Sequence, residues 1–189
     1  MTQPERTDLM TLSFRGILPL VLALMVPAGA GAQSLQKISL QGSGAVLFAT
    51  RNDPDYDSKT RLGWEAQARY TFGRFSFGAG YQRSTVFAFT EGPLTLALSF
   101  GFMEPRVVLA ARRGVALYLA GRVGAGKLVC SNPDECAPQK TNIGYGGGGG
   151  LLVRLSSRLS ADLGGQYFEV RGDLPSGYAM IRAGLGFGL

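Results

Sequence analysis

The feature that most constrains the fold of this sequence is a two-residue alternation between apolar and polar side chains. In the segment Leu62–Phe72, one face carries Leu, Trp, Ala, Tyr and Phe, whereas the other carries Gly, Glu, Gln, Arg and Thr. Successive side chains of a β-strand point to opposite faces, so this period predicts a strand with one apolar and one polar face. A water-soluble sheet alternates in the same way, and one such strand does not separate a soluble from a membrane protein.

The alternation recurs in eight segments, and the connections between them carry further information. Tight turns such as "GR" and "RRG" alternate with longer polar connections such as "RNDPDYDSKTR" and "RGDLPSG". Short periplasmic turns and longer external loops are typical of barrels in the outer membrane. We therefore predict an all-β fold, an eight-stranded antiparallel up-and-down transmembrane β-barrel with both termini on the periplasmic side. The expected strands are residues 36–50, 62–72, 75–87, 93–111, 115–129, 142–155, 159–170 and 178–189.

The first residues have the pattern of a secretory signal peptide. Arg15 precedes an apolar run from Ile17 to Val26, and small residues follow as far as Ala32. The run is shorter than the roughly 20 apolar residues of a transmembrane helix. We expect a cleaved signal peptide at residues 1–32 and one outer-membrane barrel domain at residues 33–189. No second apolar run is long enough for a transmembrane helix, so the domain would have to cross a membrane with strands.

The basic character of the chain points to anionic partners. The formal net charge is +6 and the pI is about 9.6, and such a charge attracts polyanions. Because an exported protein meets phosphate-bearing lipid or polysaccharide, we expect no nucleic-acid partner, although the charge alone does not decide this. Basic residues near the outer leaflet would contact lipopolysaccharide phosphates, and a solvated loop surface explains the same residues equally well. They are Arg51, Lys59, Arg61, Arg83, Lys127, Lys140 and Arg171.

The polar faces of the expected strands would fill the barrel interior. Eight strands enclose a space just wide enough for side chains, so we expect a filled lumen and no open pore. Buried charges are costly unless paired, which predicts salt bridges between the acidic and the basic members. We expect Glu104 to reach the interior through a β-bulge at Pro105. The expected lumen network is Glu65, Gln67, Arg69, Glu104, Arg106, Tyr118, Arg122, Arg154, Asp162, Gln166 and Arg182.

Five consecutive glycines in "IGYGGGGGLLVRL" are expected to belong to a strand. The alternation assigns the even-numbered glycines to the lumen, where their missing side chains would leave room for long neighbours. We predict that Arg122 lies beside Gly148 or Gly150 and that Gln166 lies on the other side.

The other motifs give little support for a catalytic, cofactor or metal site. Cys130 and Cys136 are expected to form a disulfide, because an exported protein favours that state. A metal site is the weaker alternative, since the chain has no histidine and no second cysteine pair. The segment "GRVGAGKL" approaches a phosphate-binding loop but has Leu128 where Ser or Thr would bind magnesium. We therefore predict no catalytic residue, no cofactor and no metal.

The final segment "YAMIRAGLGFGL", together with "GFMEPRVVLAARRGVALYLAGRVGAG", resembles the bacterial eight-stranded outer-membrane barrels of the OmpA and OmpX type. The resemblance implies a location in the bacterial outer membrane. It also implies that the barrel assembly machinery recognises the C-terminal strand as its signal. Members of this family usually end on an aromatic residue, whereas this chain has Phe187 two residues before Leu189, which weakens the expected assembly signal.

These observations predict a monomeric, non-enzymatic barrel surrounded by outer-membrane lipid and lipopolysaccharide. Its role would be structural, or one of interaction or adhesion through the external loops, one of which contains the triplet 171–173, Arg-Gly-Asp. Two alternatives remain. A small barrel enzyme acting on lipid A would be expected to use a histidine, and the chain has none. A soluble lipocalin-like barrel binding an apolar ligand would need its apolar faces to point inward.

Overall fold

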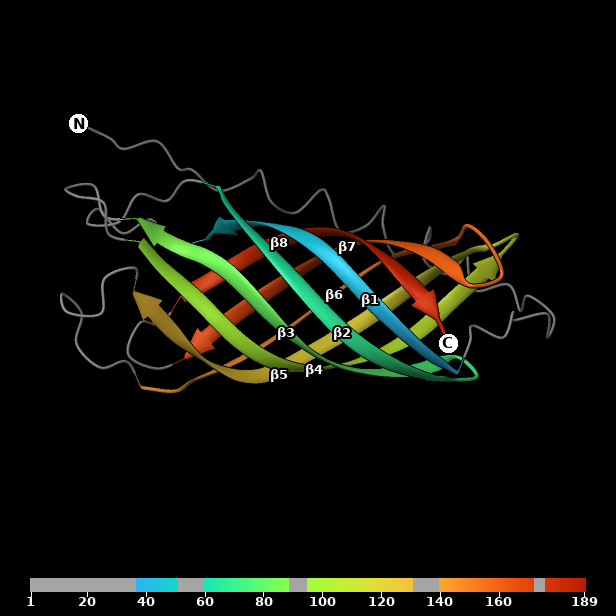
Figure 1. The fold of residues 1–189 in the computed structure, drawn as a ribbon, viewed down its shortest axis with the longest axis horizontal. Coiled ribbons are helices and arrows are strands. Elements are labelled where there is room, and N and C mark those ends of the chain that lie inside the picture. Colours follow the sequence, from blue (N-terminus) through green and yellow to red (C-terminus); the bar gives the residue numbers. More distant parts are fainter. Residues whose placement is uncertain (1–36, 51–59, 89–94, 131–139, 172–175) are drawn as a thin grey trace, which may run out of the picture.

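The computed structural model describes residues 37–50, 60–88, 95–130, 140–171 and 176–189, and the expected signal peptide lies outside them. These residues form eight β-strands (Figure 1). Among them, no helix is long and apolar enough to cross a membrane. The strands are β1 (Ile38–Ala49), β2 (Arg61–Phe72), β3 (Phe75–Ala88), β4 (Thr95–Arg112), β5 (Val115–Cys130), β6 (Asn142–Arg154), β7 (Leu159–Arg171) and β8 (Ser176–Gly188).

The strands form one closed antiparallel barrel. Each strand pairs with its neighbour in sequence, and β1 closes the sheet by pairing with β8, for example through Gly42 opposite Leu185. The predicted all-β, eight-stranded up-and-down barrel is therefore confirmed, and its strand bounds differ from the expected ones by at most two residues. Closure pairs both edges of every strand, which leaves no unpaired sheet edge.

The two ends of the barrel differ in their connections. At one end, which we call the short-turn end, tight turns join β2 to β3, β4 to β5 and β6 to β7; β1 also begins and β8 also ends there (Figure 1, right). Arg113 and Gly114 in the β4–β5 turn have φ angles of 48° and 86°. Two successive positive φ angles are what a type I′ hairpin turn requires. The opposite end, which we call the long-loop end, carries the other four connections, three of which are longer than any connection at the short-turn end.

The expected bulge at Pro105 is wrong. The register of β4 with β5 shifts between Val108 and Ala110, and it runs unchanged past Pro105. Pro105 lacks a backbone donor for the ladder, but its side chain occupies an outward position. Glu104 therefore reaches the interior by plain alternation with Phe102 and Arg106 and needs no extra residue.

The barrel is apolar outside and polar inside over much of its length. Trp64, Tyr70, Phe72 and Leu185 on the outer wall are each about half exposed, whereas Glu104 inside the barrel is completely buried. A water-soluble barrel has the opposite arrangement, with large apolar side chains in its core and charged side chains on its surface. An apolar outer face with aromatic residues towards both ends is the arrangement that a lipid environment favours.

Candidate functional site

The interior of the barrel has two parts, and the part nearer the long-loop end is apolar. We call this part the apolar plug. The rings of Phe100 and Phe168 meet edge to face at its centre with a centroid distance of 4.9 Å, and Phe100 has no exposed surface. Edge-to-face contact is a favoured geometry for aromatic pairs. The plug consists of Ala45, Leu47, Leu98, Phe100, Phe102, Leu128, Phe168, Val170, Tyr178 and Met180.

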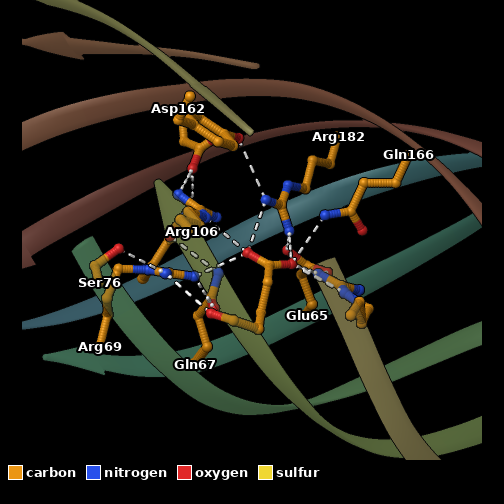
Figure 2. Close-up of polar contacts among 12 residues, drawn as sticks. Glu65, Gln67, Arg69, Ser76, Arg106, Asp162, Gln166 and Arg182 are labelled. Atoms are coloured by element: carbon orange, nitrogen blue, oxygen red, sulfur yellow. Dashed lines mark hydrogen bonds and ion pairs between the residues drawn. The ribbon is translucent and has the colours of Figure 1, made fainter. Parts of the chain in front are cut away.

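The middle of the interior holds a cluster of paired charges around Glu104 of β4. The two carboxylate oxygens of this residue accept hydrogen bonds from Arg69 at 2.8 Å, Arg106 at 2.7 Å, Arg122 at 2.6 Å and Arg182 at 2.8 Å. The side chains of Arg69, Arg106 and Arg182 converge from three different strands (Figure 2). One carboxylate thus holds four guanidinium groups together across the barrel.

Two further carboxylates complete this charged cluster. Glu65 of β2 accepts a hydrogen bond from Arg182 at 2.9 Å, and its other oxygen lies 2.8 Å from Arg122 without hydrogen-bonding geometry. Asp162 of β7 accepts hydrogen bonds from Arg106 at 2.5 Å and from the Tyr118 hydroxyl at 2.6 Å. All three carboxylates are buried, so the free energy of the cluster depends on these pairings.

Aromatic rings of β4 and β5 lie against two of the arginines. The guanidinium of Arg122 lies 3.9 Å from the ring centroid of Phe102, which belongs to the plug, and Arg106 lies 4.4 Å from that of Tyr118. A cation above an aromatic face is stabilised by the ring quadrupole, and more strongly where water is excluded. The contact of Arg122 with Phe102 connects the charged cluster to the apolar plug.

The glycines of β6 make room for large side chains from neighbouring strands. Gly150 lies opposite Tyr118 and Gly148 opposite Ala120, while Arg122 lies opposite Gly146. The prediction that Arg122 lies beside Gly148 or Gly150 is therefore wrong, because its partner Gly146 comes two residues before Gly148. The space above Gly150 is taken by the Tyr118 hydroxyl, which would lie 2.5 Å from a Cβ there.

On the other side of β6, Gln166 does lie opposite Gly148, and its Nε2 donates to Glu104 at 3.0 Å. A Cβ at Gly144 would meet the rings of Phe168 and Phe100. The even-numbered glycines thus leave space for the charged cluster at one end of the strand and for the apolar plug at the other.

The structure brings together all but one of the expected lumen residues. Arg154 is the exception: it is half-buried at the short-turn end, where it lines a separate cavity. Gln41 of β1 was not expected, yet it donates to Asp162 at 2.7 Å and accepts from Gln67 at 2.9 Å. The alternation of Ser39, Gln41 and Ser43 in β1 is the signal that could have identified it.

The expected lipopolysaccharide contacts fall into three groups. Arg83, Lys127, Lys140 and Arg171 are exposed towards the long-loop end. Arg61 is half-buried and shares the interior-facing side of β2 with Glu65, so it lies apart from the others. Two further expected contacts, Arg51 and Lys59, lie outside the described residues. The expected disulfide also lies outside them, because Cys136 and the side chain of Cys130 are not described.

Within the described part of the chain, no group of three or more His, Cys, Asp or Glu residues is arranged to hold a metal ion. The carboxylates that alternation places inside are instead bound by guanidinium groups. Such an arrangement can fix the positions of strands relative to one another, because Arg69, Arg122 and Arg182 link β2, β5 and β8 to Glu104 of β4.

No protein-family model and no curated protein sequence matches this chain. Its fold, however, matches solved structures. Neisserial surface protein A is 16% identical, with a TM-score of 0.67 over 81% of this chain and 97% of its own. Ail of Yersinia pestis, solved with the heparin analogue sucrose octasulfate, is 16% identical, with a TM-score of 0.51 over 79% and 95%.

The N-terminal β-barrel domain of Pseudomonas aeruginosa OprF is 10% identical, with a TM-score of 0.50 over 80% of this chain and 98% of its own. These identities are low, and the likeness concerns the backbone arrangement alone. Together with the closed antiparallel topology and the apolar outer wall, it shows that this chain has the fold of the eight-stranded outer-membrane β-barrels.

Proposed function

We propose that this protein is a non-enzymatic outer-membrane barrel whose interior is a structural core and whose external surface contacts anionic glycolipid. The observation that carries the proposal is the reversal of polarity: the charges of Glu104 and its arginines are buried and paired, while large apolar side chains cover the outer wall. In this orientation the short-turn end faces the periplasm and the long-loop end faces outward, as in outer-membrane barrels generally.

The filled interior supports a structural role over transport. The apolar plug closes the external half of the lumen with side chains such as Leu98 and Phe100, which have almost no exposed surface. Ions cannot cross such a layer without losing their hydration, which costs many kcal/mol. The charged groups below it pair with one another and hold their strands together, as a structural core does.

The external surface supports the interaction part of the proposal. We call the exposed residues Arg83, Lys127, Lys140 and Arg171 the external basic band. Arg171 lies 5.1 Å from the Tyr145 ring centroid, and a cation beside an exposed aromatic residue supports contact with lipid headgroups. Phosphates of lipopolysaccharide are the anions available there. Ail binds a sulfated sugar analogue, and a polyanion of that class is a second ligand to test.

The membrane location can be tested by cell fractionation and by gel mobility. We expect the protein in the outer-membrane fraction, with a mobility in detergent gels that changes on heating because the barrel resists unfolding until heated. Recovery from the aqueous periplasm without a heat-dependent shift would overturn the proposal. Conductance in planar bilayers should stay at background, and a change of lipid A mass on expression in cells would contradict the non-enzymatic assignment.

The external basic band can be tested with matched variants. The variant carries Arg83→Gln, Lys127→Gln, Lys140→Gln and Arg171→Gln, and the control removes four exposed charges at the opposite end. We expect the variant, and not the control, to lose most of its retention on lipopolysaccharide vesicles, and wild type to lose it on dephosphorylated vesicles. Equal losses in both variants would show that only net charge matters. The control changes are Lys37→Gln, Arg74→Gln, Arg112→Gln and Arg113→Gln.

A further inference from the structure

A second feature of the interior is a cavity of about 60 Å³ at the short-turn end, below the charged cluster. Arg69 and Arg106 of the cluster line it from above, and Arg154 and Arg158 line it near the mouth. Five serines also contribute to its wall, and no Asp or Glu side chain does. Its lining is therefore rich in hydrogen-bond donors and carries only positive charge.

The charges buried in the barrel do not balance. Among the described residues, four arginines, Arg69, Arg106, Arg122 and Arg182, are buried with three carboxylates, which leaves one positive charge in excess. The Nε of Arg69 also has no hydrogen-bond partner among the described residues, although this side chain is only 7% exposed. An uncompensated charge is costly in a medium of low dielectric constant, so an anion in the cavity beside Arg69 and Arg106 would be stabilised.

The surface around the mouth of the cavity also favours an anion. The three short turns carry Arg74, Arg113 and Arg158, and Lys37 lies at the same end. The acidic side chains of the described residues are Glu65, Glu104, Asp162 and Glu169, and none of them is exposed at this end. An excess of basic side chains around a low-dielectric opening raises the local concentration of anions.

We propose that this cavity binds one small oxyanion of the size of phosphate or sulfate. Planar guanidinium groups match the geometry of such oxyanions, and serine hydroxyls supply further donors. A space of about 60 Å³ is several times the minimum that holds one water molecule, so it accommodates a tetrahedral ion. Because the apolar plug closes the other half of the lumen, the site is blind and exchanges its ion only through the short-turn end.

Binding of inorganic phosphate to the purified barrel in an uncharged detergent tests the proposal. Calorimetry at constant ionic strength should give one site per barrel, and the double variant Arg154→Gln, Arg158→Gln should weaken binding by about tenfold or more. The matched control Arg83→Gln, Arg112→Gln removes two exposed charges from residues that do not line the cavity. We expect its affinity to stay within about twofold of wild type.

A steric variant separates the cavity from general charge attraction. Ser39→Leu fills the cavity from β1 without changing any charge, and it should abolish phosphate binding while the folded form keeps its heat-dependent gel mobility. Absence of saturable binding to wild type, or equal weakening by the lining and control pairs, would overturn the proposal. Binding of phosphatidylglycerol in micelles, but not of free phosphate, would assign the site to a lipid headgroup and would also overturn it. None of these outcomes depends on the cellular location of the barrel.

Discussion

The two halves of the barrel interior are filled in different ways. Around Phe100 and Phe168, the space is closed by side chains that touch their neighbours and need no particular partner. Around Glu104, it is closed by charged groups, each of which is stable only because particular groups from other strands reach it. Both fillings occur inside the same continuous sheet, so strand geometry alone does not explain the difference.

The two fillings should differ in how strongly a single substitution destabilises the barrel. A smaller side chain in the apolar plug leaves a cavity whose cost is local and grows with its volume. A lost charge in the cluster leaves its former partners buried without compensation, and contributions within one such network are not additive. Changes in the charged cluster should therefore cost more than changes of similar size in the plug.

The largest effect should come from Glu104→Gln. This change removes the negative charge that four buried arginines share, and breaking a buried ion pair costs about 3–5 kcal/mol. We expect urea unfolding in detergent to shift by at least that amount, or the barrel not to refold. Glu169→Gln, which removes a carboxylate from the outer wall, is the control and should change stability little. Similar losses for both variants would contradict the central place of Glu104.

The next effect should come from Phe100→Ala in the apolar plug. The ring is fully buried against Phe168, and Phe→Ala substitutions in cores cost about 3–5 kcal/mol. This variant should unfold at a lower urea concentration than wild type, but it should still fold into a barrel with heat-dependent gel mobility. If Phe100→Ala proved more damaging than Glu104→Gln, the proposed contrast between the two halves would be reversed.

Gly148→Leu tests the boundary between the apolar plug and the charged cluster. A Cβ at this position would overlap the carbonyl oxygen of Gly165 and the Cα of Gln166, so backbone would have to move, and overpacking costs about 1–3 kcal/mol or more. Gly147→Ala, one residue earlier on the outward face, meets only the Ala120 carbonyl at 3.4 Å and serves as the control. Refolding yield and unfolding midpoint should fall for the first variant alone.

The smallest effect should come from Tyr118→Phe. It removes the hydroxyl that donates to Asp162 at 2.6 Å, and a hydrogen bond to a charged group contributes about 1.5–3 kcal/mol. The control Tyr145→Phe removes a hydroxyl that contacts the more exposed Glu169 at 3.2 Å. Equal unfolding midpoints for the two variants would indicate that burial adds nothing to the hydrogen bond in the cluster.

Sequence patterns predicted the strands well because strand formation depends on local alternation. In β2, every second residue from Glu65 to Thr71 is buried, as the alternation indicates. Alternation was least informative in β4, where Leu98, Phe100 and Phe102 face inward between outward residues that are small or apolar. Both faces of this strand are apolar there, so the plug could not be recognised from the pattern.

The errors in the predicted interior arise where side chains from distant strands meet. The position of Arg122 opposite Gly146 depends on the register of β5 and β6. A register shift of two residues changes the partner of each residue but leaves every side chain on the same face of the sheet, so the alternation cannot detect it. The bulge at Pro105 was expected to explain how Glu104 points inward, but the sheet tolerates the missing donor of Pro105 without a shift.

The sequence by itself determined that the chain forms eight strands with one apolar face each, because side-chain direction in a strand follows from the backbone. Only the tertiary structure decided that Glu104 joins four arginines, that Gln41 reaches Asp162 and that a basic cavity remains below them. Closure of β1 on β8 sets the width of the interior and brings together residues such as Gln41 and Asp162, which are 121 positions apart. Contacts over such separations depend on register and closure, which no local pattern encodes.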